Sequence, residues 1–161
     1  YFREKDLKLL FKLYPKYSDY INTLLYTGLR FTDVYTLHSN SVIDGYLRLQ
    51  MNKTEDYLNI PLSSTVVAIL EPRINGGYLF PELQSERSRI KFRKDVQSIF
   101  DKDFVRKNNI NLHTFRHTYA HNMLNKGVPK EVLQALLGHR SIKTTEIYAN
   151  WVRKEELERW V

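Results

Sequence analysis

The spacing of apolar residues changes within this chain, and that change most constrains what it can fold into. Over most of the 161 residues, apolar side chains recur every three or four positions, which is typical of amphipathic helices. Between Val42 and Ile60 they alternate instead, and Asp44-Gly45 stands where a two-residue hairpin turn is expected. The pattern predicts a mostly α (α+β) domain with one small three-stranded antiparallel sheet inserted in it.

Residues that begin or end helices give approximate boundaries. Ser18 is predicted to be an N-cap, Gly28 a left-handed residue after a helix, and Pro129 a first-turn residue. A second reversal in the sheet, at residues 52–56, places Lys53 at a hairpin tip. The expected helices span residues 2–13, 19–27, 63–74, 85–104, 113–125, 129–137 and 141–150, with a short helical turn through Leu37.

The length and composition favour one globular domain covering residues 1–161, with an apolar tail over 151–161 that carries Trp151 and Trp160. No apolar run approaches the roughly 20 residues needed to span a bilayer. The chain has no cysteine. This excludes a disulfide framework, a thiolate metal site and a thiol nucleophile, and it fits a reducing cytoplasm.

Basic residues outnumber acidic ones, 25 to 18, which favours a polyanionic partner: nucleic acid first, and an anionic membrane surface second. Residues 84–107 hold eight basic and four acidic residues. That segment is equally compatible with a phosphate-contacting face and with a solvated helix face. The candidate DNA-binding residues in it are Arg87, Arg89, Lys91, Arg93 and Lys94.

A second set of polar residues points to phosphoryl transfer. His113 and Arg116 lie three positions apart, so they share one face of a helix. A guanidinium matches two phosphate oxygens, and an imidazole exchanges protons near neutral pH. Tyr148 offers a hydroxyl nucleophile, and cations around it can replace Mg²⁺. The remaining candidates in this set are Arg30, Lys53 and His139.

Several of these candidates also have a simpler interpretation. Arg30 and His139 could cap the ends of helices, and Lys53 could be a solvated lysine in a turn. His113, His117 and His121 recur every four residues, a spacing that can bind Zn²⁺, but no carboxylate stands near them in the same helix. No metal or cofactor is therefore expected.

Five short motifs occur together, in order, along the chain. They are Thr27-Gly28-Leu29-Arg30, Lys53-Thr54, His113-Thr114-Phe115-Arg116-His117, Leu137-Gly138-His139 and Thr144-Thr145-Glu146-Ile147-Tyr148. Together they resemble the catalytic domain of the tyrosine recombinases, the phage integrase family. The resemblance runs from the first helix to Tyr148, which is nearly the whole chain.

This resemblance implies a role for each residue at the reacting phosphate. Tyr148 would attack a DNA phosphodiester, giving a 3′-phosphotyrosine and a free 5′ hydroxyl, without metal or ATP. Arg30 and Arg116 would hold the non-bridging oxygens, and His139 would donate a hydrogen bond to the same group.

The resemblance also assigns the proton transfers. Lys53 would protonate the departing 5′ oxygen, and His113 would assist proton transfer at the nucleophile. Asp33 would support Arg30. His117 is expected to be a buried residue that makes hydrogen bonds beside the site.

The implied partners are double-stranded DNA and further copies of the chain, as a dimer or tetramer on DNA, with the tail docking on a neighbouring protomer. The expected location is the cytoplasm, on the nucleoid when DNA is bound. An N-terminal domain that completes a clamp around DNA is expected to be absent from this chain. Two other functions remain open: a type IB topoisomerase-like enzyme, and a DNA-binding module without catalysis. Phage, mobile-element and chromosome-dimer resolution enzymes all share these motifs.

Overall fold

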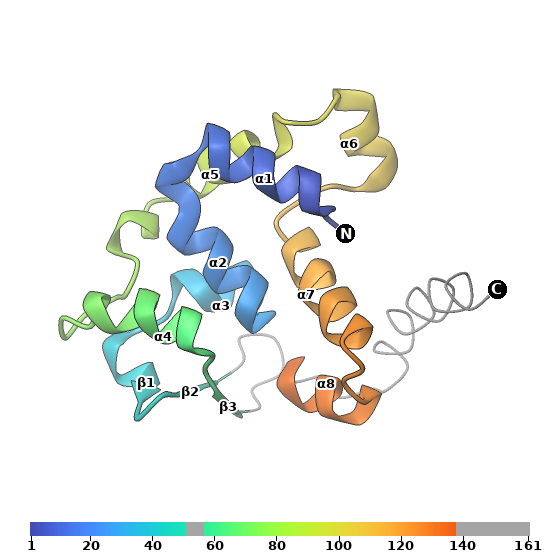
Figure 1. The fold of residues 1–161 in the computed structure, drawn as a ribbon. Coiled ribbons are helices and arrows are strands. Elements are labelled where there is room, and N and C mark those ends of the chain that lie inside the picture. The colour runs from blue at the N-terminus through green and yellow to red at the C-terminus, as the bar shows by residue number, and fades with distance from the viewer. Residues whose placement is uncertain (51–56, 138–161) are drawn as a thin grey trace.

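The computed structural model describes residues 1–50 and 57–137, which fold mainly as helices (Figure 1). The helices are α1 Glu4–Leu13, α2 Ser18–Thr27, α3 Phe31–Tyr35, α4 Ser64–Leu70, α5 Glu86–Gln97, α6 Lys102–Asn108, α7 Thr114–Asn125 and α8 Lys130–Leu137. The strands are β1 Val42–Ile43, β2 Tyr46–Gln50 and β3 Tyr57–Pro61. Short 3₁₀ turns cover Pro15–Tyr17, Ser39–Ser41, Glu71–Arg73 and Pro81–Leu83. The predicted fold class is confirmed.

The strands form an antiparallel sheet in the order β1-β2-β3. Asp44 and Gly45 both have positive φ, 50° and 76°, as a two-residue type I′ hairpin turn requires. Leu47 pairs with Ile60 across the β2–β3 ladder, and both side chains are buried. The sheet therefore packs one face on the core. The second reversal, which carries Lys53, lies outside the described residues.

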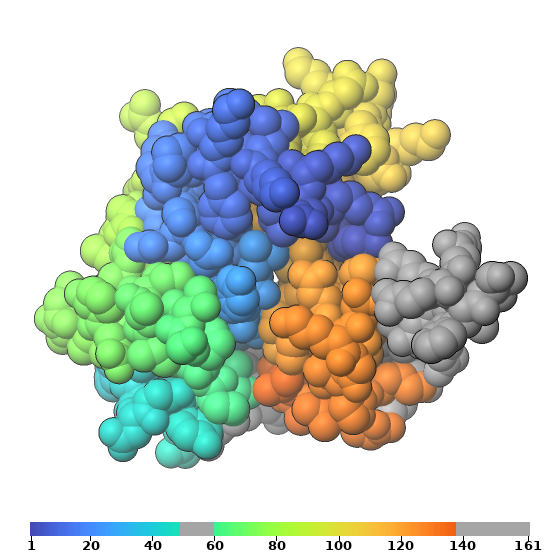
Figure 2. Space-filling view, viewed as in Figure 1, coloured from blue at the N-terminus to red at the C-terminus, as the bar shows by residue number. Residues whose placement is uncertain are grey.

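Helix α2 lies at the centre of the molecule, with α4 on one side and α7 on the other (Figures 1 and 2). Its apolar residues Ile21 and Leu24 are fully buried. Thr23 and Thr27 are also buried, and each hydroxyl donates to the carbonyl one turn earlier, at 2.7 and 2.6 Å. Because these hydroxyls are satisfied within the helix, α2 can be enclosed on both sides.

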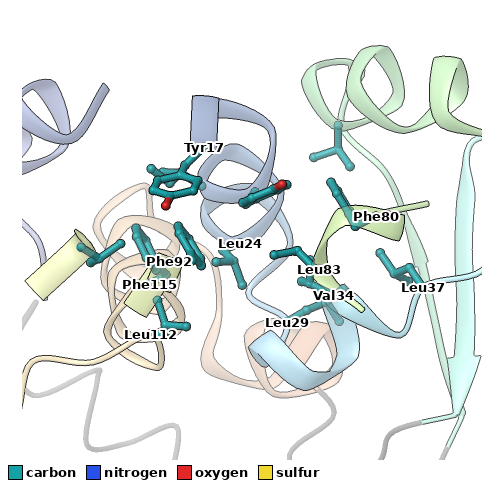
Figure 3. Close-up of a cluster of buried hydrophobic side chains, with 14 of the residues drawn as sticks. Tyr17, Leu24, Leu29, Val34, Leu37, Phe80, Leu83, Phe92, Leu112 and Phe115 are labelled. Atoms are coloured by element: carbon teal, nitrogen blue, oxygen red, sulfur yellow. The ribbon is translucent and has the colours of Figure 1, made fainter. Parts of the chain in front are cut away.

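The main core extends from α2 to α5 and α7 (Figure 3). Phe92 of α5 and Phe115 of α7 are fully buried, with ring centroids 6.4 Å apart. Burying a large aromatic side chain stabilises a fold by about 2–3 kcal/mol. This packing fixes the beginning of α7, next to His113, against α5.

The predicted helix over 85–104 is wrong, because the chain forms two helices there, α5 and α6. The hydroxyl of Ser98 donates to the carbonyl of Asp95 at 2.6 Å, and its backbone N–H is shared between the carbonyls of Lys94 and Asp95. These local bonds compete with continuation of the helix. Asp101 then occupies the N-cap position of α6.

Three other boundaries also differ from the prediction. Ser18 is the first residue of α2 and not its N-cap, because the turn at Pro15–Tyr17 runs directly into the helix. The α-helix expected over 63–74 ends at Leu70, and a 3₁₀ turn that contains Pro72 follows it. Pro129 directly precedes α8, which begins at Lys130. The helix expected over 141–150 lies outside the described residues.

None of the helices in the described part of the chain is long and apolar enough to cross a membrane.

Candidate active site

A tight turn between α2 and α3 presents Arg30. Gly28 has φ +68°, and its N–H donates to the carbonyl of Leu24 at 3.1 Å, so it ends α2 in the left-handed conformation that the sequence predicted. Arg30 stands at the N-cap of α3, where its carbonyl accepts from the N–H groups of Asp33 and Val34. Arg30 therefore lies between the end of α2 and the beginning of α3.

The guanidinium of Arg30 has an unsatisfied donor. Its Nη1 is buried and has no hydrogen-bond partner within residues 1–50 and 57–137. Leaving a buried donor unpaired costs about 1–3 kcal/mol, and more when the donor is charged. An oxygen of a bound anion would satisfy both the N–H and the charge.

Arg116 reaches the same turn from α7. It is only 2% exposed, and its Nη1 and Nη2 donate to the carbonyls of Gly28 and Leu137 at 2.7 and 2.8 Å. These two bonds hold a buried, positively charged group against the backbone carbonyls at this turn. The Arg116 guanidinium therefore lies at the turn that carries Arg30.

Asp33, predicted to support Arg30, lies in the first turn of α3 and is 1% exposed. Its backbone N–H donates to the carbonyl of Arg30 at 3.0 Å. Support of the Arg30 guanidinium by the Asp33 carboxylate stays a prediction.

His113 and His117 lie together at the beginning of α7. The two rings meet edge to face with centroids 4.8 Å apart; His113 is exposed, and His117 is partly buried. The N–H of His113 donates to Oδ1 of Asn111, and this bond helps to set where the helix starts. Burial lowers the pKa of His117, and the nearby positive charge of Arg116 lowers it further. His117 is therefore mainly neutral near pH 7.

The third histidine of the row does not form a metal site with the other two. The ring of His121 is buried and stacks on Tyr1 with centroids 3.7 Å apart. Within residues 1–50 and 57–137, no three histidine or acidic side chains are arranged to hold a metal ion. The described part of the protein gives the zinc alternative no support.

The structure divides the five basic candidates of α5 between different sides of that helix. Arg89 and Arg93 line a hollow of about 320 Å³ with Thr32 and Leu112, which neighbour Arg30 and His113 along the chain. Arg89 is partly held there, since its guanidinium lies 4.4 Å from the centroid of the Tyr35 ring and donates to the carbonyl of Leu83. Arg93 is exposed.

The other three basic residues of α5 lie away from this hollow. Lys91 pairs with Asp95 at 3.2 Å, and the same carboxylate oxygen accepts from the hydroxyl of Tyr17. Lys94 lines a separate hollow between α5 and α6, and Arg87 is exposed.

Tyr119 makes a contact at the Gly28 turn that the sequence motifs do not predict. A Cβ on Gly28 would lie 2.3 Å from Cδ1 of Tyr119 and 2.8 Å from Cδ2 of Leu137. The backbone here is in direct contact with α7 and with the end of α8. The only signal in the sequence was that Tyr119 lies three positions after Arg116 and so shares its helix face.

Three of the predicted site residues, Lys53, His139 and Tyr148, lie outside the described residues, as does the tail over 151–161. Leu137, which accepts from Arg116, directly precedes Gly138-His139 in the sequence.

The sequence is similar to those of known proteins. The sequence profile of the phage integrase family matches residues 3–155. A tyrosine recombinase of Thermosipho africanus is 30% identical over 157 residues, covering 86% of this chain and 50% of that protein. The chain thus spans about half the length of this curated relative.

Solved structures show the same fold. The crystal structure of XerA recombinase superposes with a TM-score of 0.74 at 21% identity, covering 99% of this chain and 62% of that one. XerH site-specific recombinase, bound to palindromic difH substrate in a post-cleavage complex, gives 0.71 at 19% identity, covering 99% and 52%. With the family profile spanning almost the whole sequence, the chain belongs to the phage integrase family.

Proposed function

We propose that this chain is the catalytic domain of a site-specific DNA recombinase or integrase. The hydroxyl of Tyr148 attacks a DNA phosphodiester, the bond from phosphorus to the 5′ oxygen breaks, and a 3′-phosphotyrosine forms. The reverse attack by a 5′ hydroxyl, on the original strand or a new one, releases the tyrosine and reseals the DNA. Each step exchanges one phosphodiester for another, so no ATP is needed.

The observation that carries this proposal is the bond from the Arg116 guanidinium to the carbonyl of Gly28, two residues before Arg30, whose buried Nη1 has no partner in the described part of the chain. Two cations in one partly buried place suit a phosphoryl group, whose negative charge increases during attack. A tyrosine has an ordinary pKa of about 10, so its hydroxyl also needs nearby positive charge to become a nucleophile.

The other residues follow the roles that the resemblance assigns. His139 donates to the phosphoryl oxygens, and Lys53 protonates the 5′ oxygen as it leaves. His113, beside the neutral His117, takes part in proton transfer at the tyrosine. Asp33 supports Arg30.

The proposed substrate is double-stranded DNA. The chain carries a net charge of +7, and Arg93 stands exposed on the same side of α5 as the hollow beside Thr32 and Leu112. The structural neighbour XerH was solved on its DNA substrate. We propose that α5 contacts the DNA backbone next to the cleaved phosphate, and that two or four copies of the chain assemble on DNA.

A covalent trapping experiment tests the reaction and identifies the target site at the same time. The protein is mixed at low salt with duplex DNA of randomised sequence in which sulfur replaces the bridging 5′ oxygen. The released thiol reseals poorly, so the phosphotyrosine accumulates, and sequencing the attached strands identifies the site. Tyr148→Phe should give no adduct, whereas Tyr46→Phe, at a tyrosine that is 49% exposed, should react like the parent.

The outcome separates this function from its alternatives. DNA binding without any adduct from the parent protein would favour the module without catalysis. If an adduct forms, strand exchange between two copies of the recovered site supports a recombinase. Relaxation of supercoiled DNA with no exchange would instead support the topoisomerase-like enzyme.

A further inference from the structure

Three segments of the chain meet at Gly28. They are the turn between α2 and α3, the middle of α7 and the end of α8 (Figure 1). Tyr119 touches the Gly28 backbone with ring carbons Cδ1 and Cε1, and Leu137 touches it with Cδ2. A Cβ would be only 2.3 to 2.8 Å from these three atoms, closer than real Cβ atoms approach. The packing is therefore too tight for any residue but glycine.

The polar contacts of Arg116 join the same three segments. Arg116 lies one helical turn before Tyr119, on the same face of α7. Its guanidinium donates to the carbonyls of Gly28 and Leu137. Tyr119 also contacts Gly28, and it packs with Leu137 in one buried cluster. One face of α7 thus contacts both the turn at Gly28 and the end of α8 in two ways. Arg116 makes hydrogen bonds, and Tyr119 makes van der Waals contacts.

Each of the three segments carries a candidate catalytic group. Arg30 follows Gly28 by two residues, His139 follows Leu137 by two, and α7 carries His113 at its start. The position of the turn that carries Arg30, relative to α7, therefore depends on how the segments meet. In enzymes, a displacement of about 1 Å at the reacting groups can slow the reaction on the order of 10²-fold.

We propose that Tyr119 is a positioning residue for the reaction: its ring, together with the Arg116 guanidinium, fixes the Arg30 turn and the end of α8 against α7. This inference rests on the proposed function. Tyr119 itself is 6% exposed, so its side chain is not open to a ligand at the surface. Burial raises the pKa of its hydroxyl to about 12, so the residue stays uncharged. The contact with Gly28 uses ring carbons only, so phenylalanine should replace it.

The test compares single-turnover rates of adduct formation at saturating DNA, together with the affinity for DNA and the melting temperature. Tyr119→Leu should slow adduct formation on the order of 10²-fold while leaving the DNA affinity unchanged. Tyr119→Phe should react at the parent rate. Phe80→Leu is the matched control, since Phe80 is fully buried, packs edge-on against Tyr20 and is not among the side chains that meet Gly28.

The control separates positioning from general loss of stability. Phe80→Leu should lower the melting temperature by a similar amount and leave the rate of adduct formation unchanged. If Tyr119→Leu does not fold, Tyr119→Met, which fills more of the space, decides instead. The inference would be overturned if Tyr119→Leu, or Tyr119→Met in its place, formed the adduct as fast as the parent. It would also be overturned if Phe80→Leu slowed adduct formation as much as the Tyr119 substitution does.

A second readout is independent of catalysis. Amide hydrogen exchange at Gly28 and Leu137 should accelerate in Tyr119→Leu and not in Phe80→Leu. If the parent protein forms no adduct, the proposed function fails, and exchange alone decides whether Tyr119 fixes the turn. Unchanged exchange in Tyr119→Leu would reject the positioning role.

Discussion

At the scale of single residues, the two arginines of the motifs prepare for an anion in different ways. Arg30 keeps a buried Nη1 without a partner in the described part of the chain, whereas Arg116 gives both terminal nitrogens to carbonyl oxygens. The first arrangement suits direct contact with phosphate, and the second places a charge and holds the backbone. Loss of a direct donor to a reacting group slows enzymes on the order of 10²–10³-fold.

Lys53 has a role that a change of leaving group can test. Lys53→Ala should slow cleavage of ordinary DNA by 10²–10⁴-fold, roughly the usual contribution of a general acid. It should cleave DNA with sulfur at the bridging 5′ position nearly as fast as the parent, because a thiolate leaves without a proton. Single-turnover rates on both substrates make the comparison. An equal loss on both would mean that Lys53 is not the acid.

His117 makes stability depend on pH. Its pKa in the folded protein lies below the ordinary 6.5, so the unfolded chain takes up a proton at a higher pH than the folded one. The free energy of unfolding should therefore fall as the pH drops from about 7.5 to 5.5. His117→Gln should flatten this dependence. Urea unfolding at the two pH values measures it, and parallel curves for both proteins would contradict the prediction.

At the scale of elements, the sequence predicted best those features that depend on a few neighbouring residues. The predictions of a left-handed residue at Gly28 and of a hairpin turn at Asp44-Gly45 were correct, because few residue types tolerate a positive φ. The break after α5 was missed because Ser98 is only a weak helix breaker, and its effect depends on local hydrogen bonds. The contact between Arg116 and Gly28 joins residues 88 positions apart, so no local pattern could contain it.

The two sides of α5 should contribute unequally to DNA binding. Arg93→Ala should weaken binding and reduce the salt dependence by about one phosphate contact, because Arg93 lies beside the hollow next to the site. Lys91→Ala removes the same charge from the same helix, but Lys91 pairs with Asp95 on a different side. It should have a smaller effect. Binding titrations at several salt concentrations compare the two variants. If the affinity of both depended equally on salt concentration, the two sides of α5 would not contribute differently to DNA binding.

The loop before α5 is held to α2 by Arg73. Its guanidinium bonds to Asp19 at 2.8 Å, to Glu82 at 2.9 Å and to the carbonyl of Leu79 at 3.0 Å. Arg73→Ala should lower the free energy of unfolding by about 2 kcal/mol, since charged hydrogen bonds in a half-buried place are lost. The exposed ion pair of Arg106 is the control.

Arg106→Ala should change the stability by about 0.5 kcal/mol or less, because both partners of that ion pair face solvent. Urea denaturation of the two variants gives the comparison. Similar losses in both would show that the contacts of Arg73 add nothing beyond those of a surface pair.

At the scale of the whole molecule, the net charge of +7 predicts that binding to DNA weakens as the salt concentration rises. The tail is predicted to join neighbouring copies. Deleting the residues after Asn150 should abolish cooperative assembly on DNA while leaving the binding of one copy intact. Band shifts over a range of protein concentrations measure this. Replacing Trp151 and Trp160 by alanine should give the same result, and unchanged cooperativity would reject the docking role.

The bonds of Arg116 to Gly28 and Leu137 also bear on what happens if the protein is divided. A cut in the exposed loop at Gly76 would leave the carbonyl of Gly28 in one fragment and the guanidinium in the other. Neither fragment alone could cleave DNA. Mixing the two fragments should restore cleavage only when they associate. Fused to two other proteins, the fragments could then report whether those proteins bind each other inside cells.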